Sequence, residues 1–295
     1  MLSEQSSPLE TDYTISLATL LTDVSRDLLS RHGHLWMFAI TTHRAGDLDS
    51  TEIPSWVFRA DRTSDLDQDP SNLSNVFRVP NCLEVLDRVR MQANGPHTLT
   101  LQGLAMDTIA VVACDAGTSH YQAEWMVETM TTLGFTAQEP QAPSRLAEFA
   151  TTMMCGTAET GSAAGEDVIA IMVHYLKLLL RRYASDHKDN ESDTESGLDA
   201  AYDAVEQNCR LMYASHRRLA LTINGRYALC SAQSRVGDRI VVLRGSLAPC
   251  LLRPYGVHYQ FLGEAYVHGM MKEDGDRLVR LQLAAEYEEQ TFVVR

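Results

Sequence analysis

The feature that most constrains the fold is a series of short apolar runs separated by turn residues, which extends from Leu219 to Met271. Asn224-Gly225 lies between the first two runs, and this dipeptide is typical of a tight β-hairpin because the turn needs backbone angles that Asn and Gly adopt readily. Glycine, aspartate and proline residues bracket the later runs. Strands at such close spacing indicate a closed or nearly closed antiparallel sheet.

Two apolar segments upstream are expected to join this sheet. Residues 98–101 and 106–113 read as two strands on either side of Gly103, and the second is apolar on both faces. We therefore expect an α+β fold with a small antiparallel β-barrel, built from the C-terminal strands plus one upstream hairpin. Its strands are predicted within 98–113 and 218–294, and the runs 278–283 and 292–294 are expected to complete it.

Helical periodicity marks much of the remaining chain. Helices are predicted at five segments: 14–31, 119–133, 144–154, 166–183 and 198–214. They are expected to pack outside the barrel, so that residues 1–295 form a single compact domain whose helical and loop parts are 1–97 and 115–215. Residues 185–197 contain no apolar side chain, which predicts a disordered acidic loop.

Composition excludes several classes of function. The formal net charge of −14 disfavours binding to nucleic acid and to anionic membrane surfaces. The six cysteines are dispersed, without the paired spacing of a zinc site. The acidic run Asp65, Asp67 and Asp69 lacks the glycine and the terminal glutamate of a calcium loop, so no metal is expected. There is no signal peptide and no apolar run long enough to span a bilayer, which predicts a cytoplasmic protein.

The common catalytic motifs are absent from the sequence. It contains no Gly-x-Ser-x-Gly, no Gly-x-Gly-x-x-Gly, no P-loop and no His-Glu-x-x-His. Dehydrogenases, kinases, hydrolases of the nucleophile-elbow type and zinc peptidases are therefore disfavoured, and no cofactor is expected.

The C-terminal stretch resembles the C-terminal region of fungal heterokaryon incompatibility (HET) proteins. The resemblance rests on four blocks that occur in the family's order: Gly225-Arg226, Gly237 to Ile240, Leu252-Arg253-Pro254 and Gly263 to Met270. A further block, Ile53 to Val57, is similar to the family's Leu-Pro-Ser-Trp-Val. Typical members carry a signalling domain before an Asp-Tyr helix, and here Asp12-Tyr13 lies almost at the start. The resemblance therefore implies the family's rear half standing alone.

The candidate site consists of polar groups in and near the last strands. Arg226, His258, Tyr266 and His268 can all donate hydrogen bonds, and we expect some of them to line an apolar pocket as its catalytic residues. Trp56 is the large aromatic residue of a polar loop. It either docks this loop on the core or forms one wall of the pocket, where it would bind substrate.

Two classes of function remain open. Stand-alone fungal proteins similar to the rear half of HET proteins include a norbornene-forming cyclase of diterpenoid biosynthesis, and this resemblance implies an intramolecular Diels–Alder reaction of secondary metabolism. Such a cofactor-independent cyclase, or pericyclase, would take a hydrophobic small-molecule substrate and need only orientation and a hydrogen-bond donor. The alternative is a truncated incompatibility protein that acts as a non-enzymatic recognition or regulatory module.

Overall fold

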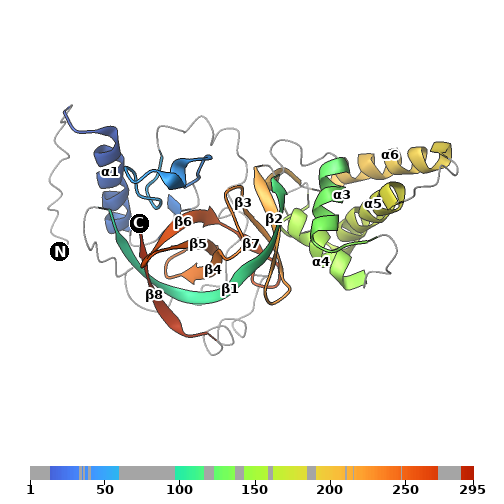
Figure 1. The fold of residues 1–295 in the computed structure, drawn as a ribbon. Helices are drawn as coiled ribbons and strands as arrows, with labels where there is room; N and C mark the ends of the chain where they lie inside the picture. Colours follow the sequence, from blue (N-terminus) through green and yellow to red (C-terminus); the bar gives the residue numbers. More distant parts are fainter. Residues whose placement is uncertain are drawn as a thin grey trace.

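The fold combines a curved sheet with helices gathered at its two ends (Figure 1). A computed structural model describes residues 14–32, 35, 37–38, 41–59, 97–115, 123–136, 143–158, 162–184, 191–209, 211–214, 216–246, 248–271 and 287–295. The predicted acidic loop with Asp65, Asp67 and Asp69 and the predicted strand 278–283 lie outside these residues. The class is α+β, as predicted from the sequence.

The strand β1, Leu99–Asp115, is the longest element of the sheet and connects its two halves. Its first half pairs with β8 (Glu289–Val294) and β4 (Arg239–Leu243), and its second half pairs with β2 (Arg217–Thr222). The predicted upstream hairpin is therefore wrong, because residues 99–115 form one continuous strand. Gly103 marks a close approach instead of a turn, since a Cβ there would lie 2.4 Å from the carbonyl oxygen of Val242 in β4.

Five of the strands close a ring of hydrogen bonds. β4 pairs with β5 (Cys250–Tyr255), β5 with β6 (His258–Glu264), β6 with β8, and β8 and β4 both with β1. The pairing of β6 with β8 is parallel, through Tyr259 and Val294, so the sheet is mixed and not wholly antiparallel as predicted. β2, β3 (Tyr227–Ser231) and β7 (Tyr266–Val267) extend the sheet beyond β1.

The hairpin predicted at Asn224-Gly225 joins β2 to β3. The Thr222 N–H donates to the Arg226 carbonyl at 3.0 Å, so the loop has three residues, and within it only Gly225 has a positive φ, of 77°. This is the geometry of a three-residue hairpin loop that ends in a left-handed residue. The two-residue turn implied by the dipeptide is therefore not formed.

Two of the sequence blocks that carry the family resemblance meet in space. The Arg253 guanidinium donates to both carboxylate oxygens of Asp238, each at 2.9 Å, and also to the Gln233 carbonyl at 2.6 Å. The Arg253 side chain is 14% exposed and that of Asp238 is 2% exposed. Because a buried charge is tolerated only when it is paired, this ion pair fixes the turn before β4 against β5.

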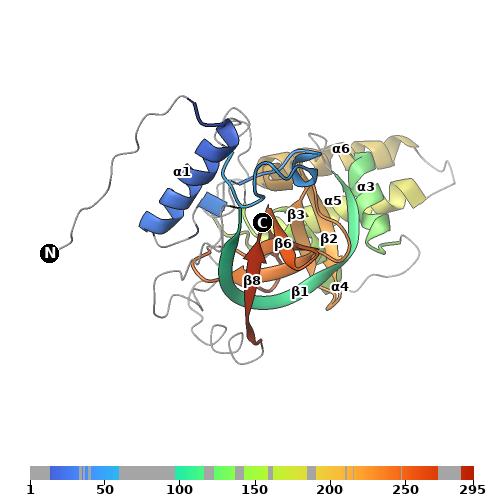
Figure 2. The same cartoon turned by 60° about the vertical axis from the view of Figure 1, so that its left-hand side comes forward.

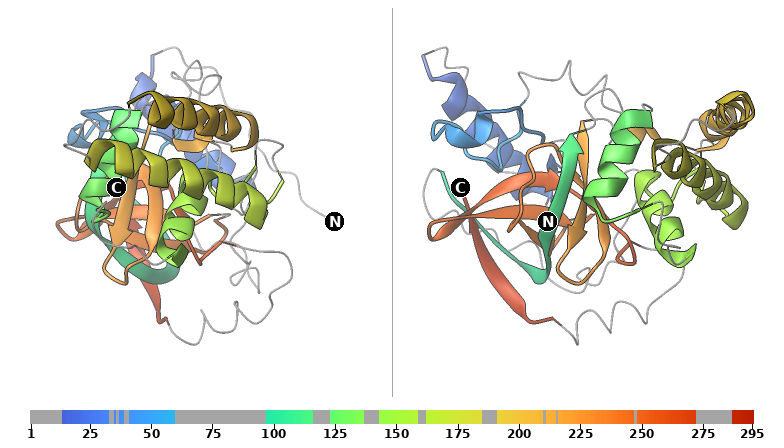
Figure 3. Two further views of the ribbon diagram at one scale, coloured as in Figure 1. Left: turned by 90° about the vertical axis from the view of Figure 1, so that its right-hand side faces the viewer. Right: turned by 45° about the vertical axis from the view of Figure 1, so that its right-hand side comes forward.

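The helices lie at opposite ends of the sheet, as the views in Figures 2 and 3 show. Those beside β2 and β3 are α3 (Ala123–Thr132), α4 (Pro143–Met153), α5 (Glu166–Ala184) and α6 (Glu191–Asn208), while α1 (Leu17–His32) lies beside the start of β1. Single turns of 3-10 helix occur at Asp47–Asp49 and Leu211–Ala214. α6 begins within the segment 185–197 that was expected to be disordered.

Three clusters of buried side chains form the core. One joins α3 to α6 with the inner face of β2 and β3, one joins α1 and the segment around Trp56 with the ring, and one fills the opposite face of the ring strands. Neighbouring residues of β4 alternate between the last two clusters: Val241 belongs to one and Val242 to the other. Both faces of this strand are buried, which explains its continuous apolar sequence.

Candidate functional site

A cavity with a volume of about 510 Å³ lies where several strands begin or end. β2 begins there, β1, β3 and β6 end there, and the segment 41–45 borders it. Most of its lining residues have polar side chains: Thr41, Thr42, His43, Arg44, Ala45, Asp115, His216, Arg217, Ser231, Ala232, Gln233, Leu262, Gly263 and Glu264. The size is that of a typical small-molecule site.

Pairing in the sheet brings these residues together from distant parts of the chain. Arg217 lies opposite Ser231 in the β2–β3 hairpin, and its neighbour Arg218 lies opposite Asp115 at the end of β1. The third edge comes from β6, which ends at Glu264. The cavity therefore forms only when both halves of the sheet are assembled.

A bulge in β6 determines where the Glu264 side chain lies. Leu251 pairs with Gly263 and Leu252 with Phe261, so Leu262 is an additional residue in β6. Simple alternation would place Glu264 on the same face as Leu262. After the bulge, Glu264 pairs with Cys250. The Glu264 side chain is therefore not on the face of Leu262, because an inserted residue changes the direction of the side chains that follow it. Gly263 has a φ of 123° at this point, a conformation that favours glycine.

Glu264 is a buried carboxylic acid at the cavity. The residue is 4% exposed, and its Oε2 atom has no hydrogen-bond partner within the part of the chain that the structure describes. Burial raises the pKa of Glu264 to about 7, and the nearby Arg217 charge lowers it only in part. A substantial fraction of Glu264 is therefore protonated at neutral pH, when it can donate a hydrogen bond.

Arg217 supports Glu264 through the main chain. Its Nη1 donates to the carbonyl oxygen of Glu264 at 3.0 Å. Arg217 also lies near the thiols of Cys155 and Cys230, whose pKa values are raised by burial and lowered slightly by the Arg217 charge, to about 12 for Cys230. These thiols are neutral at physiological pH, so Glu264 is the ionisable acid near Arg217 that titrates in that range.

His216 borders the cavity in an uncommon backbone conformation. Its φ is +53°, one of two positive values among the described residues other than glycine, and its side chain is exposed. Such a conformation costs about 1–3 kcal/mol and is concentrated at functional sites. His43 and Arg44 border the same cavity from the segment after Thr41. Two arginines and two histidines thus line a cavity that contains two acidic residues.

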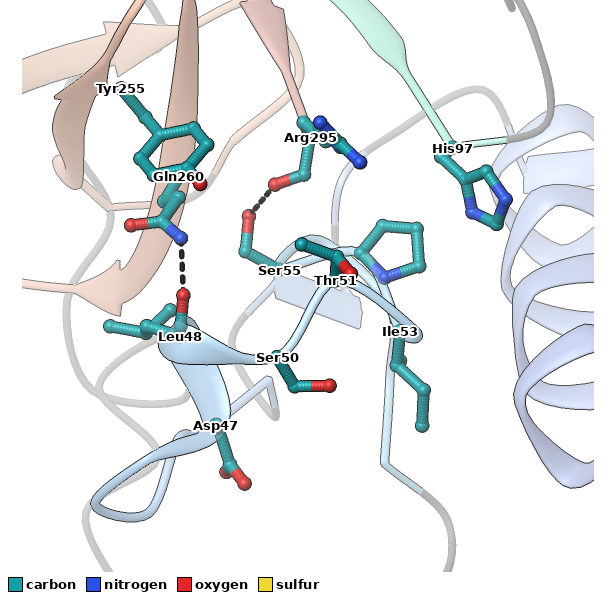
Figure 4. A pocket seen from close by; sticks show the side chains of 11 residues that line it. Asp47, Leu48, Ser50, Thr51, Ile53, Ser55, His97, Tyr255, Gln260 and Arg295 are labelled. Atoms are coloured by element: carbon teal, nitrogen blue, oxygen red, sulfur yellow. Dashed lines mark hydrogen bonds between the residues drawn. The ribbon is translucent and has the colours of Figure 1, made fainter.

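A second, smaller pocket lies between the segment 47–55 and the edge of the sheet (Figure 4). Its volume of about 20 Å³ is enough for roughly one water molecule. Ser55 joins its walls, because its hydroxyl donates to the Arg295 carbonyl and accepts from the Phe261 N–H at 2.8 Å. The Gln260 amide donates to the Leu48 carbonyl at 2.5 Å. These contacts dock the segment on the sheet, and the pocket is too small for an organic substrate.

Trp56, predicted to dock its loop or to form a pocket wall, is fully buried. Its indole N–H donates to the His97 carbonyl at 3.3 Å, and its ring belongs to the cluster that joins α1 to the ring strands. It is not among the residues that line the Glu264 cavity or the smaller pocket. These contacts dock its segment on the core, and a role of Trp56 in binding substrate stays a prediction.

The structure brings three of the four predicted donors to one part of the sheet. The Arg226 guanidinium pairs with the Asp107 carboxylate of β1 at 3.1 Å, and Tyr266 lies opposite Leu229 in the sheet. The main-chain N–H of His268 donates to the Tyr227 carbonyl at 3.0 Å. His258 lies at the start of β6, opposite Tyr255. None of the four lines either of the two cavities, and their catalytic roles stay predictions.

Glu264 and Arg217 were missed as site residues. A signal was present: Glu264 is a single charged residue in the apolar run from Phe261 to Val267, and it directly follows a glycine. A charge in a run with two buried faces is expected to have a role. The bulge that directs Glu264 toward Cys250 has no such signal, because it depends on the register with β5.

Two further properties concern metals and membranes. Among the described residues, no three His, Cys, Asp or Glu side chains are grouped as metal ligands would be. No helix in the described part of the chain has the length and apolarity needed to cross a bilayer.

The chain was compared with families of known proteins. Residues 171–289 match the family model of the Het-6 beta-barrel domain. The matched region extends from within α5 to the first residue of β8, and it contains Arg217 and Glu264. It supports the resemblance of this part of the chain to the C-terminal region of HET proteins. No curated protein and no solved structure shows a significant match to the chain.

Proposed function

We propose that the chain is a cofactor-independent enzyme that binds a small oxygenated molecule in the Glu264 cavity and closes a ring in it. The reaction we propose is an intramolecular Diels–Alder [4+2] cycloaddition of a terpenoid-type substrate. The observation that supports this proposal is the Glu264 carboxyl, which is buried beside a cavity of about 510 Å³ and keeps one oxygen without a hydrogen-bond partner among the described residues.

The cavity offers what this reaction needs. A [4+2] cycloaddition converts π bonds of a diene and a dienophile into two new carbon–carbon σ bonds, with no atom lost and no oxidant consumed. Its rate depends on holding the two partners in contact. It depends also on withdrawing electrons from the dienophile, and a hydrogen bond to a conjugated carbonyl does this. Protonated Glu264 is the donor, and its buried position strengthens the hydrogen bond.

The lining favours an oxygenated substrate over a pure hydrocarbon. Arg217 holds the backbone of Glu264 and keeps its carboxyl at the cavity, which makes Arg217 a positioning residue. His43, Arg44 and Gln233 add further polar groups, and the apolar side chains of the lining are Leu262 and two alanines. The substrate we expect therefore has several oxygen atoms near its reacting carbons.

The test compares two substitutions at Glu264 of similar size. The probe is a synthetic substrate in which a cyclic diene is tethered to an α,β-unsaturated aldehyde, and the measured quantities are the cyclisation rate and the stereoisomer ratio with and without protein. Glu264→Met removes the donor and is expected to slow the catalysed reaction about ten- to a thousand-fold, or about 1.4–4 kcal/mol. Glu264→Gln keeps an N–H donor and is expected to retain part of the rate.

The pH profile provides a second readout. The wild-type rate is expected to fall as pH rises through about 7, where Glu264 ionises, while the rate of Glu264→Gln stays flat. Alanine variants of Trp56, Arg226, His258, Tyr266 and His268 serve as a parallel set. If folded Glu264→Met kept the wild-type cyclisation rate while one variant of the parallel set lost it, the role of Glu264 would be refuted. The site would then lie at the residue whose variant lost the rate.

The second candidate is a non-enzymatic recognition module, which the match to the Het-6 beta-barrel domain favours. A surface feature fits it as well. Ile223 and Val236 are 69% and 66% exposed, and the turns that carry them flank β1, because the Ile223 N–H donates to Thr108 and the Gly237 N–H to Ile109, both at 2.9 Å. If the chain is a recognition module, Ile223→Asp is expected to abolish its effect in cells. Glu264→Met is then expected to leave that effect unchanged.

A further inference from the structure

The Glu264 cavity has a local charge opposite to that of the whole chain. The chain has a formal net charge of −14, yet the cavity is lined by Arg44 and Arg217, by two histidines, and by Asp115 and Glu264 as its acidic residues. When Glu264 is protonated, the charged residues of the lining are two arginines and one aspartate. In a partly enclosed cavity this excess of positive charge favours an anion.

The backbone around Gly263 shows that these groups belong to one site. A Cβ placed on Gly263 would lie 3.7 Å from the Thr41 carbonyl and 3.9 Å from the Cβ of Ser231. The segment that carries His43 and Arg44 therefore passes directly beside the residue before Glu264. Thr41 is itself fixed, since its hydroxyl donates to the Met37 carbonyl at 2.9 Å and the residue is 1% exposed. The cationic segment and the buried acid therefore border the same space.

We propose that this cavity binds a small-molecule carboxylate, with the Glu264 carboxyl donating to one carboxylate oxygen and with His43, Arg44 and His216 supplying the positive and N–H groups around it. This inference rests on the proposed function in using the same cavity, and it names the class of ligand that the cavity takes. A neutral acid that donates to a carboxylate forms a charge-assisted hydrogen bond, which is stronger than one between neutral groups.

The acidic residues favour a monoanion over a phosphate. Asp115 also lines the cavity, and it would repel a dianion about twice as strongly as a monoanion. A carboxylate has an oxygen that can accept the hydrogen bond from protonated Glu264. Its single negative charge matches the one arginine that the lining has in excess over aspartate. Inorganic phosphate is therefore expected to bind weakly and not to compete.

Binding of such an anion is linked to the proton on Glu264. Glu264 donates only when it is protonated, and once ionised it repels the ligand. Affinity is therefore present below a pH of about 7 and lost above it, by up to about tenfold per pH unit. Other groups near the site also titrate or carry charge: His43 and Arg44 in the segment 41–45, Asp115 in β1, His216 and Arg217 at β2, Cys230 in β3 and Cys250 in β5. The histidines alone would give a pH dependence that does not require Glu264.

The experiment measures binding without any reaction. Cinnamate, 2-naphthoate and abietate are each compared with their primary amides by calorimetry and by thermal shift at pH 6.0 and 8.5. We expect at least one carboxylate to bind at least tenfold more tightly than its amide at pH 6.0, and to lose about tenfold or more at pH 8.5. Glu264→Gln is expected to remove most of this pH dependence, and Arg44→Gln to weaken the carboxylate while leaving the amide unchanged.

Each outcome bears on the proposal separately from catalysis. Equal affinity for acid and amide, no binding by any of the three carboxylates, competition by inorganic phosphate, or an unchanged pH dependence in Glu264→Gln would overturn it. Carboxylate binding with the expected pH dependence would support it even if the tethered diene showed no catalysed cyclisation, and in that case the cyclase proposal alone would fail. Thermal unfolding of the unliganded variants confirms that each is folded.

Discussion

At Glu264, the loss of solvation on burial outweighs the attraction of a nearby guanidinium, because Arg217 directs Nη1 to the main-chain carbonyl of Glu264. Glu289 shows the opposite balance at the surface. Its pKa is lowered, chiefly by hydrogen bonds from Arg244, one of them 2.8 Å long. The two glutamates differ in burial and in the atom that the arginine contacts. Burial together with the atom that the arginine contacts therefore determines which of the two carboxyls stays protonated.

The raised pKa of Glu264 predicts how stability changes with pH. The ordinary pKa is 4.5 and the folded value is about 7, so the folded state holds the proton more tightly than the unfolded state. Stability from this residue is present below pH 4.5 and is lost as pH rises to about 7. Glu264→Gln does not lose this stability as pH rises. The difference in the free energy of unfolding between Glu264→Gln and wild type should therefore shift in favour of the variant by up to about 3 kcal/mol from pH 5 to pH 8.

Urea unfolding at both pH values measures this difference. Glu289→Gln is the matched control, because the pKa of Glu289 is shifted in the opposite direction and its exposed ion pair with Arg244 has a small effect. If the difference between Glu264→Gln and wild type did not change from pH 5 to 8, Glu264 would have an ordinary pKa in the folded protein.

The candidate site was only partly predictable from the residues. The sequence shows which side chains can donate hydrogen bonds, but not which of them are already paired. Arg226 is held by Asp107 of β1, a contact that spans 119 positions. Trp56 is held by the His97 carbonyl. Glu264 comes to the cavity through a bulge opposite Leu251 and Leu252, and long-range register of this kind is not visible in local patterns.

Among the elements, β1 shows where reading glycine as a turn signal fails. The apolar runs before and after Gly103 were recognised correctly, but the glycine lies within the strand because β4 passes close to it. The same local signal succeeded at Asn224-Gly225, where no other strand approaches Gly225. Four of the five predicted helices lie close to their predicted bounds, since periodicity within one helix needs no partner, whereas α6 spans Glu191–Asn208 and not 198–214. Strand pairing does need one, which explains why the parallel β6–β8 contact was missed.

Gly103 and Gly197 provide a prediction about the elements. A Cβ on Gly103 would lie 2.4 Å from the Val242 carbonyl and 2.9 Å from the Cα of Leu243, and both are backbone atoms that cannot move aside alone. Gly103→Ala is therefore expected to lower the free energy of unfolding by about 1–3 kcal/mol or more. A Cβ on Gly197, which lies in α6, would meet no neighbouring atom within 4 Å, so Gly197→Ala should stabilise by about 0.5–1 kcal/mol. Equal effects of the two substitutions in chemical denaturation would contradict the close approach of β1 and β4.

On the scale of the whole molecule, the helices beside β2 and β3 share their core with the sheet. The cluster that contains residues of α3 to α6 also contains Leu219, Leu229 and Tyr266 of the sheet. Tyr227 lies at the centre of this contact: its ring stacks on Phe135 at 5.8 Å and meets Phe149 edge-on at 5.7 Å. The helices thus have little apolar surface to bury without β2 and β3.

This shared core predicts that helices and sheet unfold in one transition, and Tyr227 provides the test. The Tyr227 hydroxyl accepts a hydrogen bond from Arg145 Nε at 2.7 Å, while Arg145 Nη2 donates to the Leu133 carbonyl at 2.8 Å. Tyr227 is buried, and Tyr227→Phe removes the acceptor for Nε, so it should destabilise by about 1–3 kcal/mol. Tyr202→Phe is the control, because in the described structure the Tyr202 ring contacts Tyr175 and no hydrogen bond of its hydroxyl is found.

Two probes then follow unfolding in wild type and in both variants: circular dichroism at 222 nm, which is dominated by the helices, and near-ultraviolet circular dichroism, which reports on the packed aromatic rings. If the core is shared, Tyr227→Phe shifts both midpoints to lower denaturant by the same amount, and Tyr202→Phe shifts neither by much. Should the helical signal be lost at a midpoint that Tyr227→Phe leaves in place, the helices would form a separate folding unit. The prediction of a single cooperative domain would then be wrong.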